Sequence, residues 1–238
     1  MGASRMRLLM LSAVWVLAAC QPTSAPVQDT SSVTPVQENP MNAYWNSLSS
    51  DMDEIPAARQ ADLKRMADWV QNQLDQQDTA ALIFICTHNS RRSHFGQVWA
   101  QVAADQLGIK GIATYSGGTE ATACNPRTIE AMMRAGLPIL QPEYISDNPV
   151  YCVAQPPMSL WSKRFDDASN PSSEFAAIMT CSDADQACPS VAGASFRLAL
   201  PYEDPKVSDG TAEEDSVYDA RCRQIAAEMR WAFEQIKR

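Results

Sequence analysis

The feature that most constrains the fold is an apolar run, residues 80–85, followed by a polar octapeptide and then by a helical pattern. The run reads Ala-Ala-Leu-Ile-Phe-Ile, and a short apolar stretch of this kind is typical of a buried strand. The octapeptide, residues 86–93, reads Cys-Thr-His-Asn-Ser-Arg-Arg-Ser. Apolar residues then recur with helical spacing at Phe95, Val98 and Val102. The sequence therefore predicts a strand, a short loop and a helix in direct succession.

A loop in this position can form a cradle for a tetrahedral oxyanion. Backbone N–H groups and the positive end of the following helix point toward its centre. An arginine such as Arg92 can bind two oxygens at once. The same positive field favours the thiolate of Cys86, which makes this residue the predicted nucleophile. We expect the oxyanion to be surrounded by Thr87, His88, Asn89, Ser90, Arg91 and Arg92.

Four apolar stretches predict the strands of one sheet, and helical patterns separate most of them. The stretches are residues 80–85, 112–115, 175–180 and 195–200. Strands that alternate with helices indicate an α/β fold, with a parallel sheet and helices on both faces. In such sheets the chemistry gathers beyond the carboxyl ends of the strands. The residues that follow the predicted strands and are therefore expected there are Cys86, Ser116, Cys181 and Asp204.

A less regular stretch interrupts the alternation between the second and third predicted strands. Residues 150–154 and 160–165 read as two further strands joined through Pro156-Pro157. We therefore expect a small irregular or hairpin insertion around residues 140–174.

The first twenty residues read as an export signal. Arg5 and Arg7 precede an apolar stretch, residues 8–16, that is too short to span a bilayer. The following Leu-Ala-Ala before Cys20 resembles the bacterial lipobox, which implies cleavage before Cys20 and a lipid on its sulfur. The alternatives are an ordinary secretory signal with an incidental cysteine, or a start site assigned too far upstream.

Residues 21–54 follow as a predicted flexible tether. They carry four prolines among Ser, Thr, Gln and Val, and such a stretch buries too little apolar surface to fold. Residues 55–238 then fit one domain. The lipobox resemblance implies a lipid-anchored domain at the cell envelope, facing the periplasm or in the outer membrane. Gln21 differs from the aspartate that holds lipoproteins in the inner membrane.

The charge and the histidine count exclude some functions. The formal net charge is −9 and no stretch is rich in Lys and Arg, which argues against nucleic acid as a partner. With two histidines in the chain, no His-based metal site is expected. The cysteine spacing does not fit zinc. We therefore expect neither a metal nor another cofactor.

The spacing of Cys86, Arg92 and Ser93 on a strand–loop–helix unit resembles the low-molecular-weight protein tyrosine phosphatase superfamily, which includes the thioredoxin-coupled arsenate reductases. The resemblance spans roughly residues 80–236. It implies a four-stranded parallel sheet of order 2-1-3-4. It also implies that Cys86 is the nucleophile, Arg92 binds the oxyanion and Ser93 stabilises the thiolate, while Asn89 holds the shape of the loop.

The chain departs from the family pattern at two loop positions. His88 stands where the family often has glycine, and Arg91 stands where it often has a second cysteine. The dipeptide Asp204-Pro205 resembles the general acid of the family, although an exposed acidic turn is the alternative. Lys206 follows where phosphatases of the family often have a tyrosine, which counts against phosphotyrosine as substrate.

The pair Cys181 and Cys188 separates the branches of this superfamily. Phosphatases need no such pair, whereas the arsenate reductases have a similar one. In the implied strand order Cys86 and Cys181 follow neighbouring strands, about 4.8 Å apart, which is within disulfide reach. On a rigid helix Cys181 and Cys188 would stand roughly 10.5 Å apart, so bonding them requires the segment to unwind. A fixed disulfide or two inert thiols are the alternatives.

Three functions follow from these features. In an arsenate reductase-like enzyme, Cys86 attacks arsenate, Asp204 protonates the departing oxygen, and Cys181 and Cys188 relay the oxidation to a thioredoxin-like reductant. In a phosphomonoesterase, Cys86, Arg92 and Asp204 act alone on a phosphate ester. In a membrane-tethered oxyanion-binding protein the thiol is unreactive. An exported protein faces an oxidising compartment, so the first function also needs a reductant in the envelope.

Overall fold

The computed structural model describes residues 39–142, 144 and 146–237 of the chain. The predicted export signal, residues 1–20 with the lipidation site Cys20, lies outside the described residues, and so does the first part of the predicted tether, residues 21–38. Among the described residues, no helix combines the length and the apolar character that a membrane span requires.

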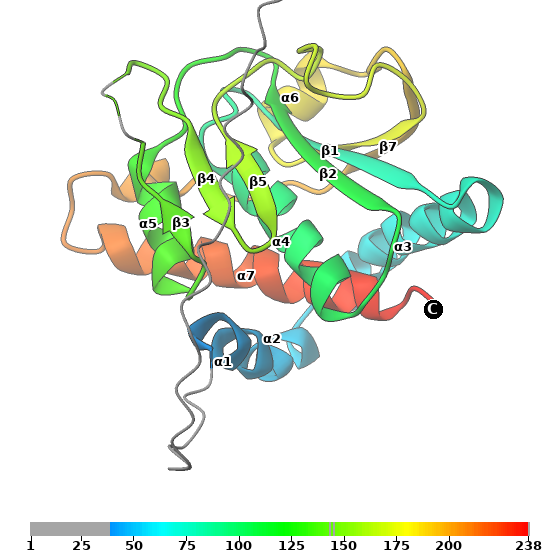
Figure 1. Cartoon of the computed structure of the whole chain (residues 1–238), viewed down its shortest axis with the longest axis horizontal. Coiled ribbons are helices and arrows are strands. Elements are labelled where there is room, and N and C mark those ends of the chain that lie inside the picture. The colour runs from blue at the N-terminus through cyan, green and yellow to red at the C-terminus, as the bar shows by residue number, and fades with distance from the viewer. Residues whose placement is uncertain (1–38, 143, 145, 238) are drawn as a thin grey trace, which may run out of the picture. The chain divides into compact units, whose positions relative to one another are not determined.

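A four-stranded parallel sheet forms the centre of the fold (Figure 1). Its strands are β1 (Ala80–Cys86), β2 (Ile112–Gly118), β6 (Phe175–Met179) and β7 (Ala194–Ala199). They are arranged in the order β2-β1-β6-β7, which confirms the α/β fold and the order 2-1-3-4. Because β1 lies between β2 and β6, the residues that follow β1 and β6 meet at the carboxyl edge of the sheet.

Both faces of β1 are buried, which explains its uninterrupted apolar sequence. Leu82 and Phe84 point into the larger core, together with residues of α3 (Ala57–Gln77), α4 (Arg92–Gln106) and α7 (Glu214–Glu234). Ile83 and Ile85 point into a smaller core on the opposite face, which the short helix α6 (Ser182–Ala187) and adjoining loops cover. The long helices thus lie on one face of the sheet, and α6 lies on the other (Figure 1).

The described part of the predicted tether is helical, so that prediction is wrong from Asn39 onward. Two short helices, α1 (Pro40–Ser47) and α2 (Ser49–Asp53), precede α3. The side chain of Asn39 caps α1 by accepting a hydrogen bond from an amide of the first turn. Trp45 and Leu48 are buried in the larger core. Apolar residues at helical spacing therefore anchor a segment whose prolines and polar residues indicated a linker.

A small antiparallel sheet of order β3-β4-β5 follows α5 (Pro126–Arg134), as the predicted insertion requires. Its strands are β3 (Ile139–Leu140), β4 (Tyr151–Ala154) and β5 (Pro157–Leu160). The predicted strand at 160–165 is wrong, because β5 ends at Leu160. Residues 161–165 run past the end of β2 instead, where Arg164 forms an isolated bridge with Gly118. Because Gly118 pairs with Cys86 at the end of β1, the insertion also reaches the loop that follows β1.

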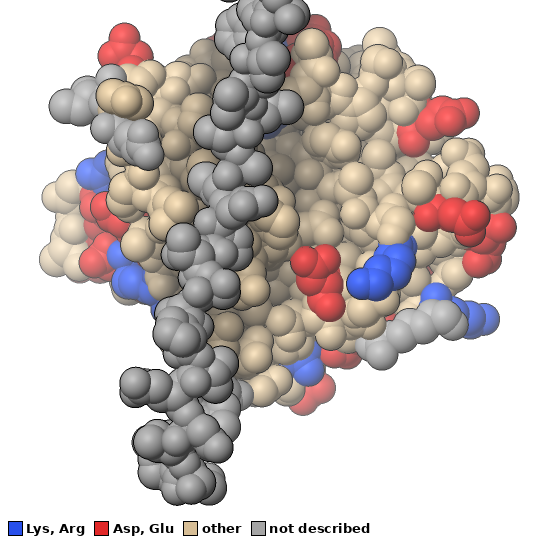
Figure 2. Space-filling view, in the orientation of Figure 1, with Lys and Arg blue, Asp and Glu red and all other residues tan. Residues whose placement is uncertain are grey.

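Charged side chains are scattered over the face shown in Figure 2, and uncharged residues make up most of the surface in view. Several arginines of the described chain pair with carboxylates, as Arg223 does with Asp51 at 2.6 Å and Arg134 with Asp219 at 2.8 Å. Over the described part of this face, no extended basic area of the kind that follows a phosphate backbone is visible.

Candidate active site

The octapeptide forms a loop between the carboxyl end of β1 and the first turn of α4. Asn89 has a left-handed backbone (φ 46°), which asparagine adopts more readily than most residues. Gly118 of β2 packs directly against the loop. A Cβ at this glycine would lie 2.7 Å from the carbonyl oxygen of Thr87 and 2.8 Å from the amide nitrogen of Asn89. Glycine is therefore required at position 118, and β2 supports the loop from one side.

The carbonyl groups of the loop are held from outside it. Hydrogen bonds of 2.8, 2.8 and 3.0 Å reach the carbonyl oxygens of Thr87, His88 and Ser90 from the Glu120 amide, the Ser162 hydroxyl and the Asn125 amide. In a trans peptide the carbonyl and the following N–H point in opposite directions. The amides that follow these three carbonyls therefore face the inside of the loop. Amides arranged in this way can bind an anion next to Cys86.

A chain of hydrogen bonds leads to the thiol of Cys86, which is buried. Asn89 Nδ2 donates to Ser93 Oγ at 2.9 Å, and Ser93 Oγ lies 3.1 Å from Cys86 Sγ. Because the serine oxygen already accepts from Asn89, its own proton is free to be donated to the sulfur. Such a bond stabilises the thiolate rather than the thiol. Asn89 is itself oriented by the Lys163 amide, which donates to Oδ1 at 2.9 Å.

Arg92 lies between the loop and the segment that carries Asp204. Its Nη1 donates to the carbonyl oxygen of Tyr202 at 3.0 Å, and its Nη2 donates to Asp204 Oδ2 at 2.7 Å. Asp204 also caps the short 3-10 helix η1 (Pro205–Ser208) by accepting from the Lys206 amide at 3.1 Å. The structure therefore brings the predicted acid directly to the predicted oxyanion ligand.

The side chain of Arg91 does not have the position expected of an oxyanion ligand, so the expectation is corrected for this guanidinium and stays a prediction for the backbone amide. Its Nε donates to the hydroxyl of Tyr218 at 2.7 Å, and its Nη2 lies 3.4 Å from Asp209 Oδ2. Its Nε is also 3.9 Å from Asp204 Oδ1. The buried tyrosine and the two carboxylates direct this guanidinium toward α7 and η1. Arg91 and Arg92 therefore donate their hydrogen bonds to different residues.

The other expected oxyanion residues contribute backbone rather than side chain. Thr87 Oγ1 lies 3.5 Å from Cys181 Sγ. The His88 side chain is exposed, and its Nε2 lies 3.6 Å from a carboxylate oxygen of Glu120. Ser90 is buried against α5, where its carbonyl oxygen also accepts from Thr128 Oγ1 at 3.4 Å. An oxyanion at this loop would therefore contact backbone amides, namely those of His88, Asn89 and Arg91, rather than these side chains.

Cys181 and Cys188 flank α6, and one residue, Thr180, separates Cys181 from the end of β6. Cys86, Cys181 and Cys188 all belong to or pack against the smaller core, and all three are free thiols. Cys181 is 1% exposed, and its Sγ accepts a hydrogen bond from the Ala184 amide at 3.4 Å. Arg197 of β7 holds the other end of α6, because it donates to the carbonyl oxygen of Cys188 at 3.1 Å. The first two thiols therefore lie in the same small core, and an ordered helix separates the third from Cys181.

The insertion contributes site residues that the sequence reasoning missed. Ser162 donates to His88, and the amide of Lys163 orients Asn89. Asn148 in turn holds Ser162, accepting from its amide at 3.0 Å and donating to its carbonyl at 2.8 Å. No local pattern indicates the contacts of Ser162 with His88 and of Lys163 with Asn89, since each joins residues 74 positions apart in the sequence.

His94 supports the loop from the interior and is not a ligand. It is fully buried on the first turn of α4, and its Nδ1 lies 3.2 Å from the hydroxyl of Ser116. Burial lowers the pKa of this imidazole to about 3, and the positive charge of Lys163 acts in the same direction. His94 is therefore neutral at physiological pH. Ser116, expected at the site, contacts this histidine in the core.

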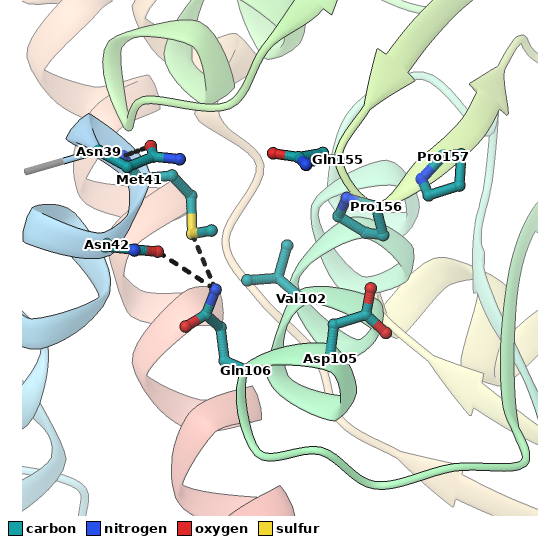
Figure 3. Close-up of a pocket in the computed structure, with 9 residues that line it drawn as sticks. All are labelled: Asn39, Met41, Asn42, Val102, Asp105, Gln106, Gln155, Pro156 and Pro157. Atoms are coloured by element: carbon teal, nitrogen blue, oxygen red, sulfur yellow. Dashed lines mark hydrogen bonds between the residues drawn. The ribbon is translucent and has the colours of Figure 1, made fainter. Parts of the chain in front are cut away.

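A cavity of about 400 Å³ lies near the far end of α4, away from the loop (Figure 3). Val102, Asp105 and Gln106 line it from the last turns of α4. Gln106 Nε2 donates across it to Asn42 Oδ1 at 3.3 Å. Since α4 rises about 1.5 Å per residue from Arg92, these residues lie roughly 15–20 Å along the helix from the loop. None of the predicted site residues lines this cavity.

Comparison with known proteins agrees with this geometry. Residues 81–150 match the family model described as low molecular weight phosphotyrosine protein phosphatase. An arsenate reductase 2 of Staphylococcus haemolyticus is 40% identical over 63 residues, which cover 26% of this chain and 44% of that relative. An arsenate reductase of Bacillus licheniformis is 28% identical over 151 residues, or 62% of this chain and 89% of that protein. The chain thus spans under half the length of the first relative.

The fold also overlaps with solved structures. A crystal structure of a YwlE mutant from Bacillus subtilis overlaps with a TM-score of 0.44 at 14% sequence identity. The overlap covers 66% of this chain and 98% of the other. A structure described as an arsenate reductase in the phosphate binding state overlaps with a TM-score of 0.40 at 16% identity, and covers 67% of this chain and all of the other.

Proposed function

Because residues 81–150, which include the loop that follows β1, match the low molecular weight phosphotyrosine protein phosphatase family, we propose that the protein is a thiol-dependent arsenate reductase-like enzyme. The family match and the arsenate reductase relatives support a cysteine-based reaction on an oxyanion. The observation that carries the proposal is the placement of three free cysteines at one edge of the sheet, Cys86, Cys181 and Cys188.

The first step joins arsenate to Cys86. The amides of the loop and Arg92 bind the oxyanion, and the thiolate of Cys86 attacks arsenic. One oxygen leaves and must be protonated, and Asp204 is the carboxylic acid next to Arg92 that supplies this proton. The product is an arsenic(V) adduct on the sulfur of Cys86, together with water.

The second step reduces arsenic. The thiolate of Cys181 attacks the sulfur of Cys86, a Cys86–Cys181 disulfide forms, and the electron pair of the sulfur–arsenic bond leaves with arsenic as arsenite. Cys188 then attacks Cys181, which releases Cys86 as a thiolate and leaves a Cys181–Cys188 disulfide. A thioredoxin-like dithiol reduces this disulfide and is itself oxidised. The α6 helix between the last two cysteines has to unwind for the transfer.

A second candidate function is a phosphomonoesterase. The observation that favours it is that Cys86, Arg92 and Asp204 form a complete site for phosphoryl transfer without the other two thiols. The hydrogen-bonded α6 helix, held by Arg197, is equally compatible with cysteines that never exchange. Lys206, which follows Asp204-Pro205, supplies no aromatic surface for a phosphotyrosine ring.

Arsenite release from arsenate tests the proposal. The full chain is assayed with a thioredoxin system, without it, and as the Cys86→Ser variant. We expect repeated turnover to arsenite only when both the reductant and Cys86 are present, while the wild type without the reductant releases at most one arsenite per protein molecule. Hydrolysis of an aryl phosphate by the wild type, without arsenite in any condition, would establish the phosphomonoesterase instead. A wild type with neither activity contradicts both functions.

We further propose that a lipid on Cys20 anchors the enzyme at the cell envelope. The support is the sequence pattern alone: basic residues, a short apolar stretch and small residues before the cysteine. A thioredoxin-like partner in the envelope is then required, because the relay consumes a dithiol in each cycle. Incorporation of labelled palmitate that disappears in a Cys20→Ser variant checks the anchor, and equal labelling of the variant contradicts it.

A further inference from the structure

Arg91 is a largely buried charged side chain of the octapeptide that the proposed reaction does not use. Its side chain is 11% exposed, and it donates to Tyr218 at 2.7 Å and toward Asp209 at 3.4 Å. The tyrosine hydroxyl donates onward to Asp209 at 2.7 Å. Three side chains thus close a ring of hydrogen bonds between the loop, α7 and the residue after η1. Such a ring holds the Arg91 guanidinium in place, because a guanidinium is planar and its N–H donors have fixed directions.

The ring holds one end of the segment that carries Asp204. Asp209 directly follows η1, and Asp204 directly precedes it. Arg92 binds the segment at Asp204 and Arg91 binds it at Asp209, so adjacent arginines hold both ends of η1 against the loop. Arg91 Nε also lies 3.9 Å from Asp204 Oδ1, on the side opposite to the contact with Arg92.

The contact of Arg92 with Asp204 and the contact of Arg91 with Asp209 behave differently during the proposed reaction. An oxyanion in the loop recruits Arg92, whose guanidinium then has to share or give up its contact with Asp204. The partners of Arg91 do not change during that step. The phenol of Tyr218 keeps its proton, because burial and the hydrogen bond to Asp209 raise its pKa to about 12. The ring therefore persists while the other attachment is exchanged.

We propose that Arg91 is a positioning residue that keeps Asp204 at the oxyanion when Arg92 turns to the substrate. This assignment rests on the proposed function and replaces the role of oxyanion ligand that the sequence indicated. Arg91 takes no proton and forms no covalent bond in the reaction. It acts through Asp209, through Tyr218 and through its own proximity to Asp204, and thereby affects protonation of the departing oxygen but not binding of the oxyanion.

The experiment compares Arg91→Met and Arg91→Lys with the wild type in the full chain, with Arg65→Met as the matched control. Arg65 is an exposed arginine of α3 that pairs with Asp62. Two quantities are measured: kcat and KM for arsenate, and the protection of Cys86 by inorganic phosphate against alkylation with iodoacetamide. We expect Arg91→Met to lower kcat about tenfold or more, since a positioned acid typically contributes about 100-fold or more. KM and phosphate protection stay within about threefold, because the oxyanion cradle is intact.

Rescue distinguishes positioning from a general structural effect. Arg91→Lys restores a cation beside Asp204 and Asp209, and we expect it to recover part of the lost kcat, while Arg65→Met behaves as the wild type. Loss of phosphate protection in Arg91→Met overturns the proposal, because Arg91 would then bind the oxyanion itself. An unchanged kcat overturns it as well. A wild type that converts neither arsenate nor a phosphate ester overturns the proposed function, which is a separate result.

Discussion

Arg92 and Asp204 share a hydrogen bond of 2.7 Å, from Nη2 to Oδ2, so the predicted oxyanion ligand and the predicted acid contact each other directly. Both side chains are largely shielded from water, at 11% and 29% exposure. An oxyanion held by the loop amides needs the same guanidinium. The carboxylate of Asp204 and the substrate therefore compete for Arg92. Because of this competition, removing the carboxylate should affect oxyanion binding and turnover in opposite directions.

Asp204→Asn should bind oxyanions more tightly and turn over more slowly. Removal of the negative charge frees Arg92 for the ligand, so phosphate should protect Cys86 from iodoacetamide at a severalfold lower concentration. Loss of the acid should lower kcat for arsenate by about 100-fold or more. Asp68→Asn, a change of an exposed carboxylate on α3, serves as control. Weaker protection by phosphate in Asp204→Asn contradicts the competition.

Ser93→Ala should make Cys86 a poorer nucleophile without removing the loop. The hydroxyl of Ser93 lies 3.1 Å from the sulfur and can donate to a thiolate, which loses that stabilisation when the hydroxyl is absent. We expect the rate constant for alkylation of Cys86 at pH 6 to fall about tenfold. Asn89→Ala should act in the same direction, because Asn89 orients Ser93. Equal alkylation of Ser93→Ala and wild type would show that the serine does not stabilise the thiolate.

The buried His94 should make stability depend on pH below neutrality. Its pKa is lowered from 6.5 to about 3 by burial, so the unfolded chain binds a proton between these values that the folded chain does not. The contribution to stability is complete above about pH 6.5 and is lost as the pH falls toward 3. The slope for one proton is about 1.4 kcal/mol per pH unit.

Urea unfolding of the full chain at pH 7.0, 6.0 and 5.5 measures this slope, above the range where carboxylates titrate. The variant His94→Gln, which cannot be protonated, should show a flatter dependence over the same interval. An equally steep decline in both proteins would assign the effect to other groups.

Arg197→Met should speed the last disulfide exchange of the relay. Arg197 donates to the carbonyl oxygens of Cys188 and Asp185 and pairs with the Asp185 side chain, so it opposes unwinding of α6. We expect the Cys86–Cys181 disulfide to decay severalfold faster in the variant. Rapid acid quenching followed by alkylation and mass spectrometry follows that species. Arg65→Met, a change of an exposed arginine on α3, is the control, and a slower decay in Arg197→Met would mean that Arg197 assists the exchange.

The fold was predictable where the pattern is local. The apolar run at 80–85 and the spacing from Cys86 to Ser93 locate the central strand, the loop and the helix, and the implied strand order is observed. The different roles of Arg91 and Arg92 were not predictable from the sequence. They depend on contacts with distant residues, because Arg91 donates to Tyr218 of α7 and Arg92 donates to Asp204 next to η1. The contact of Lys163 with Asn89 joins distant segments, and no periodicity reports it.

The segment 39–54 shows a different limit of sequence reasoning. Its prolines and polar residues are typical of a linker, yet Pro40 begins a helix that Asn39 caps, and Trp45 and Leu48 reach the core. The linker prediction rested on the average composition of the whole segment. A helix of two turns needs only a cap and a few apolar residues at the right spacing, which the average composition does not reveal.

The measurement that tests the central claim most directly is disulfide mapping of the Cys188→Ser variant after addition of arsenate without any reductant. If three thiols act in sequence, this variant releases one arsenite per protein molecule and then holds a Cys86–Cys181 disulfide, which peptide mass spectrometry identifies. Release of no arsenite, or of several equivalents with Cys86 and Cys181 still alkylatable, would contradict the account.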